Sequence, residues 1–316
     1  MSTKEELRTG RRVRNGKVQV LVPADEPEKA IDTWTLTRGD CLDPLLGMAQ
    51  LADRSVDHVI TDPPYSEHVH AAQRIGQTPR DLSRDRSKRQ ISRSKDPGFE
   101  HITQALRVAC VREFARVARR WVLIFSDEES QFLWAAAGRR AGLEPVRVGH
   151  WHKLGSTPQF TGDRPAVAVE AITILHKPGK KRWNGGGRHA IWSHSIVLDR
   201  GDGNEARVHT TQKPLSLMRA LVADFTDPGE SVLDPFAGSG TTGVAAVECG
   251  RRFIGWERNE KYHAIATARL RNAREQLQIP LTKRRQKKAE QFDLLGALIQ
   301  VSKEAEAEGI TAELDP

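Results

Sequence analysis

The stretch that decides the fold is Ser231-Val232-Leu233-Asp234-Pro235-Phe236-Ala237-Gly238-Ser239-Gly240-Thr241-Thr242. Its apolar start predicts a short buried strand that ends at Asp234, and residues 241–249 predict a helix that Gly250 closes. Gly238 and Gly240 permit a tight turn between strand and helix, in which the backbone can approach a ligand closely. The first N–H groups of the helix then face an anionic group such as a carboxylate. The stretch therefore predicts a ligand site at the turn.

Predicted strands and helices alternate on both sides of this stretch. We expect strands at residues 56–61, 121–125, 146–151, 167–175 and 252–256, and helices at residues 44–51, 102–118, 130–140, 215–225 and 260–277. The strands at 146–151 and 167–175 are expected to form a hairpin. This alternation predicts an α/β fold with a mostly parallel sheet.

Composition divides the 316-residue chain into three parts. Residues 1–33 are polar and predict an N-terminal arm, residues 34–280 predict one α/β domain, and residues 281–316 predict a basic and amphipathic tail. Inside the domain, residues 66–100 and 177–210 are rich in basic side chains and poor in periodic pattern. We therefore expect two long loops there, and long loops in compact domains are usually functional or disordered.

The composition also disfavours several classes of protein. No apolar run approaches the ~20 residues that cross a membrane, and the charged N-terminus is unlike a secretory signal. Cys41, Cys110 and Cys249 lie far apart, which argues against a zinc cluster or a disulfide framework and suits a reducing cytoplasm. The His-x-His pairs at residues 68–70 and 150–152 lack the neighbours of a zinc pattern, so no metal is expected.

A second motif, Asp62-Pro63-Pro64-Tyr65, follows the strand predicted at residues 56–61. Two consecutive prolines fix φ and remove two N–H donors, so the Pro63 carbonyl can point into a cleft from a stiff backbone. The Asp62 carboxylate is a second acceptor close by, and the Tyr65 ring can stack on a flat ligand. Two acceptors and a ring suit a base with an exocyclic amino group. A plain proline turn at a strand end is the alternative.

The late motif leaves a second ligand class open. Gly238, Gly240 and Gly243 match the spacing G-x-G-x-x-G of dinucleotide sites. The Asp-Pro-Phe that precedes them is not part of that fingerprint, and no G-x-x-x-x-G-K-[ST] phosphate loop occurs. The strand at residues 252–256 leads to Glu257, an acid that can accept both hydroxyls of a ribose.

Taken together, the motifs resemble those of the β class of amino-methylating DNA methyltransferases, which transfer a methyl group from S-adenosylmethionine to a base amino nitrogen. In that class the catalytic tetrapeptide precedes the cofactor loop, as residues 62–65 precede residues 234–240 here. The resemblance covers roughly residues 34–277. Three further elements match the class: Gly39-Asp40-Cys41 near the cofactor adenine, Thr211-Gln212-Lys213-Pro214 before the helix that precedes the loop, and Gly255-Trp256-Glu257 at the ribose.

The resemblance implies a circularly permuted Rossmann-like methyltransferase fold, with helices on both faces of the sheet and a small target-recognition insertion. It implies a catalytic site of Asp62, Pro63, Pro64 and Tyr65. It also implies S-adenosylmethionine as cofactor, held by residues at several motifs: Asp40, Cys41, Lys213, Asp234, Phe236, Gly238, Gly240, Thr241 and Glu257.

A tetrapeptide that begins with Asp, not Ser, resembles adenine-N6 enzymes more than cytosine-N4 enzymes. The predicted reaction is therefore methylation of the N6 amino group of adenine in DNA. Cytosine-N4 methylation and an RNA substrate remain open, as does a different class, a catalytically inactive DNA-binding protein on the same scaffold. A homodimer and a restriction–modification context are compatible with the class.

A formal net charge of +8 favours double-stranded DNA as the partner. The loop at residues 66–100 begins beside the tetrapeptide and is expected to close on DNA phosphates. Residues 177–210 occupy the place of the class's target-recognition region, where basic residues and tryptophans suit backbone contact and stacking. A solvated basic loop is the alternative for both segments. The residues expected on DNA are Arg80, Arg84, Arg86, Lys88, Arg89, Arg182, Trp183 and Arg188.

Overall fold

The computed structural model describes residues 11–14, 17–20, 33–65, 102–156, 158, 163–196 and 212–278. The chain divides into two units, Met1–Thr33 and Trp34–Pro316. In the first unit, strands β1 (Arg11–Arg14) and β2 (Lys17–Val20) pair antiparallel, a hairpin that the sequence did not predict. The loop expected at residues 66–100 and the tail expected at residues 281–316 lie outside the described residues.

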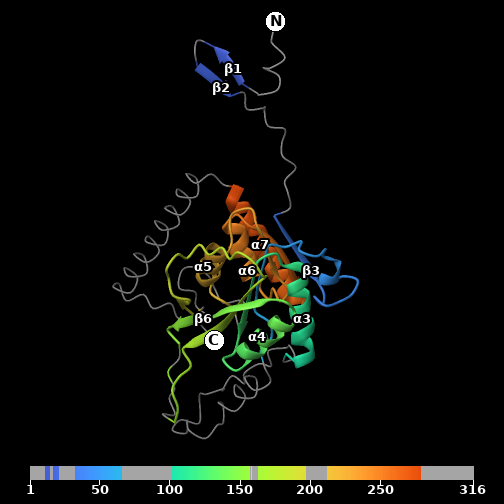
Figure 1. The fold of residues 1–316 in the computed structure, drawn as a ribbon, viewed down its shortest axis with the longest axis vertical. Helices are drawn as coiled ribbons and strands as arrows, with labels where there is room; N and C mark the ends of the chain where they lie inside the picture. The colour runs from blue at the N-terminus through green and yellow to red at the C-terminus, as the bar shows by residue number, and fades with distance from the viewer. Residues whose placement is uncertain are drawn as a thin grey trace, which may run out of the picture. The chain divides into compact units, whose positions relative to one another are not determined.

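The second unit is built on an eight-stranded open sheet in the order β3-β10-β9-β4-β5-β7-β6-β8 (Figure 1). The first five strands of this order run parallel, β7 is antiparallel to both its neighbours, and β8 is parallel to β6. The predicted mostly parallel sheet and the β6–β7 hairpin are therefore confirmed. The strands are β3 (Trp34–Arg38), β4 (His58–Thr61), β5 (Trp121–Ser126), β6 (Glu144–Leu154), β7 (Val169–His176), β8 (Ile191–Ser195), β9 (Ser231–Asp234) and β10 (Arg252–Glu257).

Helices cover both faces of this sheet. Successive side chains of a strand point to opposite faces, so Val59 and Ile60 of β4 enter different cores. Ile60 packs in the core that includes residues of α5, α6 and α7, whereas Val59 packs in the core that includes residues of α3 and α4. The α-helices of the described residues are α3 (Gln104–Val117), α4 (Ser130–Arg140), α5 (Leu215–Phe225), α6 (Thr241–Glu248) and α7 (Glu260–Gln278).

The helix predicted at residues 44–51 is wrong, because only the 3-10 turn η1 (Met48–Gln50) forms there. Gly47 is extended, with φ −89° and ψ −162°, and ends any helix that starts at Asp43. Asp43 still accepts hydrogen bonds from the N–H groups of Leu45 and Leu46 at 2.8 and 2.9 Å. Both leucines are exposed, at 76% and 62%, so no apolar face would stabilise a longer helix.

Residues 177–210, predicted to lack regular structure, contain the edge strand β8. Its Trp192 is buried and donates its indole N–H to Asp224 on α5 at 2.9 Å. Trp183 lies 4.9 Å from the Phe225 ring, centroid to centroid. The strand therefore forms because its Trp192 packs on α5, next to Trp183 from the preceding loop. A sequence pattern within a Gly-rich segment does not reveal such tertiary packing.

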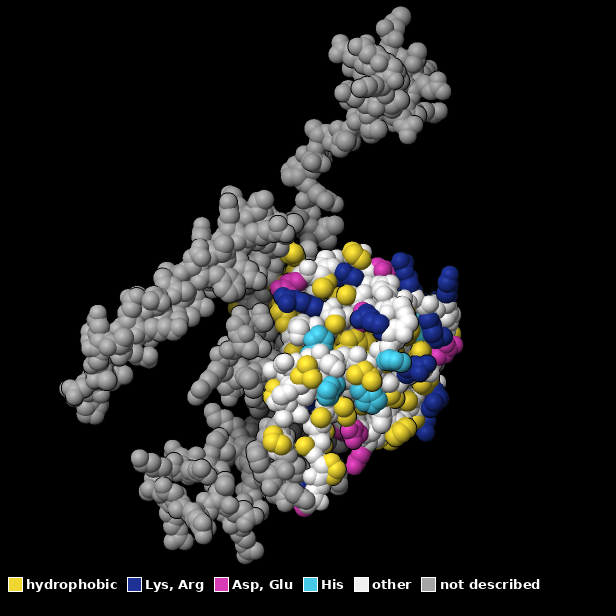
Figure 2. Space-filling view, turned by 90° about the vertical axis from the view of Figure 1, so that its left-hand side faces the viewer, with side chains coloured by type: hydrophobic (Ala, Val, Ile, Leu, Met, Phe, Trp, Pro, Cys, Tyr) yellow, Lys and Arg dark blue, Asp and Glu magenta, His cyan; other side chains and the backbone are white. Residues whose placement is uncertain are grey.

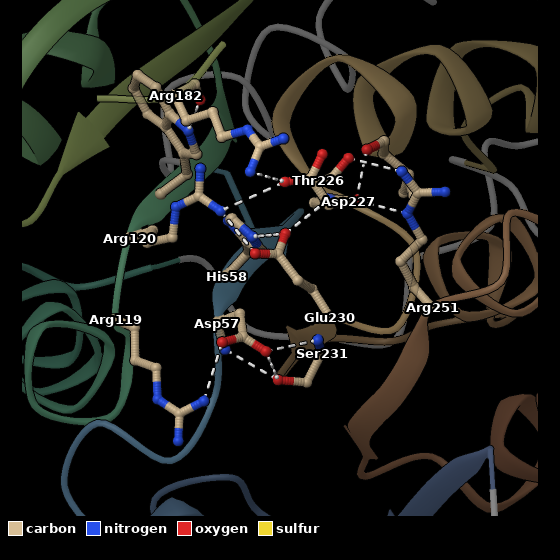
Figure 3. Close-up of polar contacts among 12 residues, drawn as sticks. Asp57, His58, Arg119, Arg120, Arg182, Thr226, Asp227, Glu230, Ser231 and Arg251 are labelled. Carbon is tan, nitrogen blue, oxygen red and sulfur yellow. Dashed lines mark hydrogen bonds and ion pairs between the residues drawn. The ribbon is translucent and has the colours of Figure 1, made fainter. Parts of the chain in front are cut away.

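A cluster of polar contacts joins the amino-terminal ends of β4, β5 and β9 (Figure 3). His58 Nε2 lies 2.8 Å from Glu230 Oε2, and Arg120 Nη1 lies 2.6 Å from Glu230 Oε1. Asp57 accepts hydrogen bonds from the N–H and the hydroxyl of Ser231, at 2.9 and 2.8 Å. Burial would raise the pKa of Glu230, but the hydrogen bond with His58 helps lower it to about 2. These contacts hold the amino-terminal ends of β4, β5 and β9 together.

Candidate active site

Four acidic residues lie at the carboxyl ends of four neighbouring parallel strands. Across the sheet they follow the strand order β3, β10, β9 and β4: Asp40, Glu257, Asp234 and Asp62. Ligands of open α/β sheets bind in the crevice outside these strand ends. The two predicted sites, for cofactor and for base, therefore share one edge of the sheet.

A hydrogen bond joins the strand before the tetrapeptide to the late motif. The Thr61 hydroxyl, on the last residue of β4, donates to Asp234 Oδ1 at 2.7 Å. The Phe236 N–H donates to the same oxygen at 3.1 Å, which braces the start of the turn. Burial raises the pKa of Asp234 to about 6, although hydrogen bonds from Thr242 and Thr61 oppose it. Asp234 thus fixes the glycine turn against the strand that bears the tetrapeptide.

Glu257 holds the other side of the turn. Its Oε2 accepts the Gly238 N–H at 2.8 Å, and its Oε1 accepts the Asn259 N–H at 2.6 Å. A Cβ built on Gly238 would meet nothing nearer than the Phe236 carbonyl oxygen, at 4.0 Å. The turn therefore leaves open space above Gly238, with an oriented carboxylate at its border.

The Gly39-Asp40-Cys41 element lies beside Glu257. The Gly39 N–H donates to the Glu257 carbonyl at 3.1 Å, and Asp40 Oδ1 accepts the Leu42 N–H at 2.9 Å. The Cys41 side chain is only 4% exposed and packs in the core that includes Cys110. A hydrogen bond with Cys110, together with burial, raises the pKa of the Cys41 thiol. A ligand at this element would therefore meet Asp40 and backbone, with the sulfur inside the core.

Gly240→Ala should destabilise the protein and weaken ligand binding at the turn. Gly240 has φ +81°, and an added Cβ would lie 2.8 Å from the Ala266 Cβ on α7. The left-handed backbone alone costs about 1–2 kcal/mol for an L-residue, and the contact with α7 adds to it. Gly229→Ala is the matched control, because Gly229 has φ +83° and no heavy atom within 4 Å of an added Cβ. Urea unfolding of both variants measures the difference, and equal losses would contradict the contact with α7.

Lys213 joins the tetrapeptide to β7. Its Nζ lies 2.6 Å from Asp62 Oδ2 and 2.7 Å from Glu170 Oε1, and it donates to the Tyr65 hydroxyl at 3.3 Å. The Tyr65 hydroxyl also donates to Glu170, and Lys153 Nζ lies 2.8 Å from Glu170 Oε2. The resemblance placed Lys213 on the cofactor, whereas the structure brings its ammonium group to the tetrapeptide.

Two carboxylates and two ammonium groups balance one another in this cluster. Burial would raise the pKa of Glu170, but Lys213 and Lys153 lower it to about 2. Burial would lower the pKa of Lys213, but Asp62 and Glu170 raise it. Burial raises the pKa of Asp62, with Lys213 opposing it, and burial raises the pKa of Tyr65 as well. Lys213 is thus a permanent cation between the buried Glu170 carboxylate and the partly exposed Asp62 carboxylate.

Sequence reasoning missed Glu170 and Lys153. Glu170 could have been found, because it is a single acid inside the apolar run at residues 167–175. A charged residue is rarely buried unless it is paired, so this position predicts a basic partner. Lys153 gave no such signal, since a lysine near the end of a strand is common on any surface. Their approach to Asp62 depends on β7 and β6 following β5 in the sheet, an order that the sequence pattern does not specify.

The residues predicted on DNA in the segment 177–210 make protein contacts in this structure. The Trp121 indole N–H donates to the Arg182 carbonyl at 2.7 Å, and Arg182 Nη1 lies 3.1 Å from Asp227 Oδ2 (Figure 3). Arg188 pairs with Asp224 on α5. Arg182 therefore lies at the amino-terminal edge of the sheet, opposite the edge that bears Asp62. The residues predicted on DNA in the other loop lie outside the described residues: Arg80, Arg84, Arg86, Lys88 and Arg89.

Histidines gather among hydrophobic side chains on the face drawn in Figure 2. His150 and His152 lie on β6, and His152 Nδ1 is 3.1 Å from the Ser193 hydroxyl on β8. Within the described part of the chain, no three His, Cys, Asp or Glu side chains lie close enough to hold a metal ion. A search of the same residues finds no helix with the length and apolar character of a membrane span.

Comparison with known proteins gives the class. The N6/N4 family described as DNA methylase matches residues 56–268, and the chain therefore belongs to that family. YubD of Escherichia coli (strain K12), a methylase by name, is 34% identical over 242 residues, which are 74% of this chain and 88% of YubD. Type II methyltransferase M.HinfI of Haemophilus influenzae is 33% identical over 135 residues, 38% of each protein.

Solved structures confirm the predicted Rossmann-like methyltransferase fold. M1.HpyAVI, solved in complex with S-adenosylmethionine, superposes with a TM-score of 0.54 at 22% identity, over 75% of this chain and all of that one. The cytosine-N4-specific PvuII DNA methyltransferase superposes with a TM-score of 0.56 at 16% identity, over 75% of this chain and 86% of that one. Family and fold together make this chain a DNA methyltransferase of the N6/N4 type.

Proposed function

We propose that this DNA methyltransferase transfers a methyl group from S-adenosylmethionine to the N6 amino group of adenine in DNA. The observation that carries the proposal is the unpaired state of the Asp62 Oδ1 atom in the described part of the chain. This atom is buried and has no hydrogen-bond partner among the described residues, beside the oxygen that Lys213 holds. A buried acceptor of this kind calls for a donor, and an exocyclic amino group supplies two N–H donors.

The choice of adenine rests on the tetrapeptide. It begins with Asp62, and in the amino-methylating class an initial Asp is more typical of adenine-N6 enzymes than of cytosine-N4 enzymes. The PvuII enzyme is cytosine-N4-specific, but its similarity at 16% identity supports the fold alone. Cytosine-N4 methylation is therefore the outcome that would revise this proposal without changing the site.

The residues at the turn fit S-adenosylmethionine. Two backbone N–H groups orient the Glu257 carboxylate and leave it lone pairs for ribose hydroxyls. The open space above Gly238 admits a ligand close to the backbone. Asp40 lies at the adjoining strand end, and the first N–H groups of α6 suit a carboxylate. When bound, the cofactor supplies an electrophilic methyl group on a positively charged sulfur.

This chain's own residues would handle the base. The target base must leave the duplex, because pairing occupies its amino group. The Tyr65 ring stacks on it, and Asp62 Oδ1 and the Pro63 carbonyl accept its two N–H groups. That orientation directs the nitrogen lone pair at the methyl group, so proximity and alignment supply much of the rate. Asp62 then takes up the proton that the nitrogen loses.

DNA contacts are proposed for both basic segments. Residues 66–100 continue directly from Tyr65, so their arginines and lysines suit phosphates near the flipped base. Residues 177–210 are proposed to contribute less near the base than the sequence suggested, since Arg182 pairs with Asp227 at the opposite edge of the sheet. A homodimer and a cytoplasmic restriction–modification role are compatible with this proposal.

The proposal is tested by identifying the methylated nucleoside. Purified protein is incubated with methyl-labelled S-adenosylmethionine and unmethylated DNA, and the DNA is digested to nucleosides. We expect label in N6-methyl-2′-deoxyadenosine. Label in N4-methyl-2′-deoxycytidine would overturn the choice of base, and label only in an RNA control would overturn the choice of nucleic acid. Cofactor binding without any transfer would indicate a DNA-binding protein on a methyltransferase scaffold.

A further inference from the structure

Glu170 is a charged side chain inside an apolar strand. It is 7% exposed, and its partners Lys153, Lys213 and Tyr65 come from three other segments of the chain. A buried carboxylate costs free energy even when it is paired, so this arrangement marks a functional constraint rather than a gain in stability. We propose that Glu170 is a positioning residue for methyl transfer, which fixes Lys213 and Tyr65 so that Asp62 presents one free oxygen to the base. The inference rests on the proposed function.

The Lys213 ammonium lies between two carboxylates at nearly equal distances. It is 2.6 Å from Asp62 Oδ2 and 2.7 Å from Glu170 Oε1. Because Glu170 also attracts the ammonium group, Lys213 contacts only one of the two Asp62 oxygens. The other oxygen, Oδ1, has no partner in the described part of the chain. Glu170 therefore keeps one acceptor of Asp62 available for an N–H group.

Glu170 also fixes the ring that would stack on the base. The Tyr65 hydroxyl donates to Glu170, and the Tyr65 carbonyl accepts the Ile102 N–H at 3.1 Å. The residue is thus held at its backbone and at the far end of its side chain. A ring held at both ends loses little further freedom when a base stacks on it, which is the benefit of preorganisation.

Lys153 completes the arrangement from β6. Its Nζ lies 2.8 Å from Glu170 Oε2, the oxygen that does not contact Lys213. Each Glu170 oxygen therefore has its own cation, and the charges of Asp62, Glu170, Lys153 and Lys213 sum to zero. Because the cluster is neutral as a whole, Glu170 can stay ionised in a buried position.

Glu170→Gln keeps the shape of the side chain and removes its charge. We expect kcat for DNA methylation to fall by about 10- to 100-fold, since a small misplacement of reacting groups has effects of this order. The dissociation constant for S-adenosylmethionine, measured by calorimetry, should change less than about twofold, because Glu170 does not belong to the turn that would hold the cofactor. An unchanged kcat in the folded variant would overturn the inference, while methylation by the wild-type protein would leave the proposed function intact.

A double-mutant cycle with Tyr65→Phe separates positioning from a merely structural role. Tyr65→Phe keeps the stacking ring and removes the hydroxyl that contacts Glu170. If Glu170 acts partly through Tyr65, the loss caused by Glu170→Gln should be smaller by about threefold or more in the Tyr65→Phe background. Losses that simply multiply would contradict positioning through Tyr65 and overturn the inference.

Glu230→Gln is the matched control. Glu230 is also a carboxylate with two basic partners, His58 and Arg120, but it lies at the amino-terminal edge of the sheet (Figure 3). Glu230→Gln should lower the melting temperature and leave kcat of the folded protein unchanged. An equal fall of kcat in Glu230→Gln and Glu170→Gln would overturn the inference. Should Glu170→Gln fail to fold, Glu170→Asp retains the charge but shortens the reach, and full kcat there would also overturn it.

Discussion

Asp62→Ala should lower kcat for methyl transfer by about 10²- to 10⁴-fold, the range typical of a group that handles a proton in the reaction. The variant loses the free acceptor Oδ1 and the carboxylate that would take up the proton. Its fold should persist, because the Lys213 ammonium keeps Glu170 as a partner at 2.7 Å. The measurement is single-turnover methylation of DNA at saturating cofactor, with cofactor affinity determined in parallel by calorimetry.

Asp57→Ala is the matched control for this prediction. Asp57 precedes β4, whereas Asp62 follows it, so the two acids lie at opposite ends of the same short strand. Loss of Asp57 leaves the Ser231 N–H and hydroxyl without their acceptor. It should lower the free energy of unfolding by about 1–3 kcal/mol without changing kcat of the folded protein. Full activity in Asp62→Ala would contradict the proposed mechanism.

The order and type of most elements could be predicted from sequence because apolar runs are bounded by turn residues. The strand at residues 121–125 was predicted from an unbroken apolar run and is observed as β5 (Trp121–Ser126). The helix over Leu215–Phe225 was predicted at its observed bounds, and Pro214 is its N-cap, a position that needs no helical N–H. The motifs predicted two candidate ligand sites, because backbone chemistry at prolines and glycines is local and therefore visible in sequence.

The remaining features depend on tertiary contacts. The helix predicted at residues 44–51 did not form because Gly47 turns the chain back on itself, and a Cβ there would lie 2.5 Å from the Cys41 carbonyl oxygen. β8 forms because Trp192 packs on α5. Lys213 was assigned to the cofactor by resemblance, but its distance to Asp62 depends on how α5 is placed against β4 and β7. Sequence spacing carries no information on such distances.

Lys213→Met should have the second large effect, on both catalysis and stability. The variant leaves the buried Glu170 carboxylate beside the partly exposed Asp62 carboxylate, without the cation they share. Loss of one partner of a buried ion pair costs about 3–5 kcal/mol. Lys213 opposes the rise in the pKa of Asp62 that burial causes, so its removal raises that pKa further. The acidic limb of the pH profile of kcat should therefore move to higher pH.

Lys153→Met tests whether this shift arises at Asp62. Lys153 contacts Glu170 but not Asp62, so its loss should leave the acidic limb in place. Among the described residues, the other titratable groups that face Asp62 are Glu170, Tyr65 and Asp234, and both variants retain them. An acidic limb that moves equally in Lys153→Met and Lys213→Met would contradict a direct action of Lys213 on Asp62.

The stability of Lys213→Met should also depend on pH with a definite sign. In the wild-type protein the pKa of Glu170 falls from 4.5 to about 2 on folding, although burial opposes it. Its ionised form therefore stabilises the native state above pH 4.5, and this contribution is lost as the pH falls towards about 2. Without Lys213, only Lys153 opposes burial at Glu170, so the pKa of Glu170 lies higher in the variant than in the wild type. The variant therefore loses less stability than the wild type as the pH falls from 4.5 to about 2. The difference in unfolding free energy between the two proteins should narrow as the pH falls, because the protons that neutralise the two carboxylates replace the charge that Lys213 supplied.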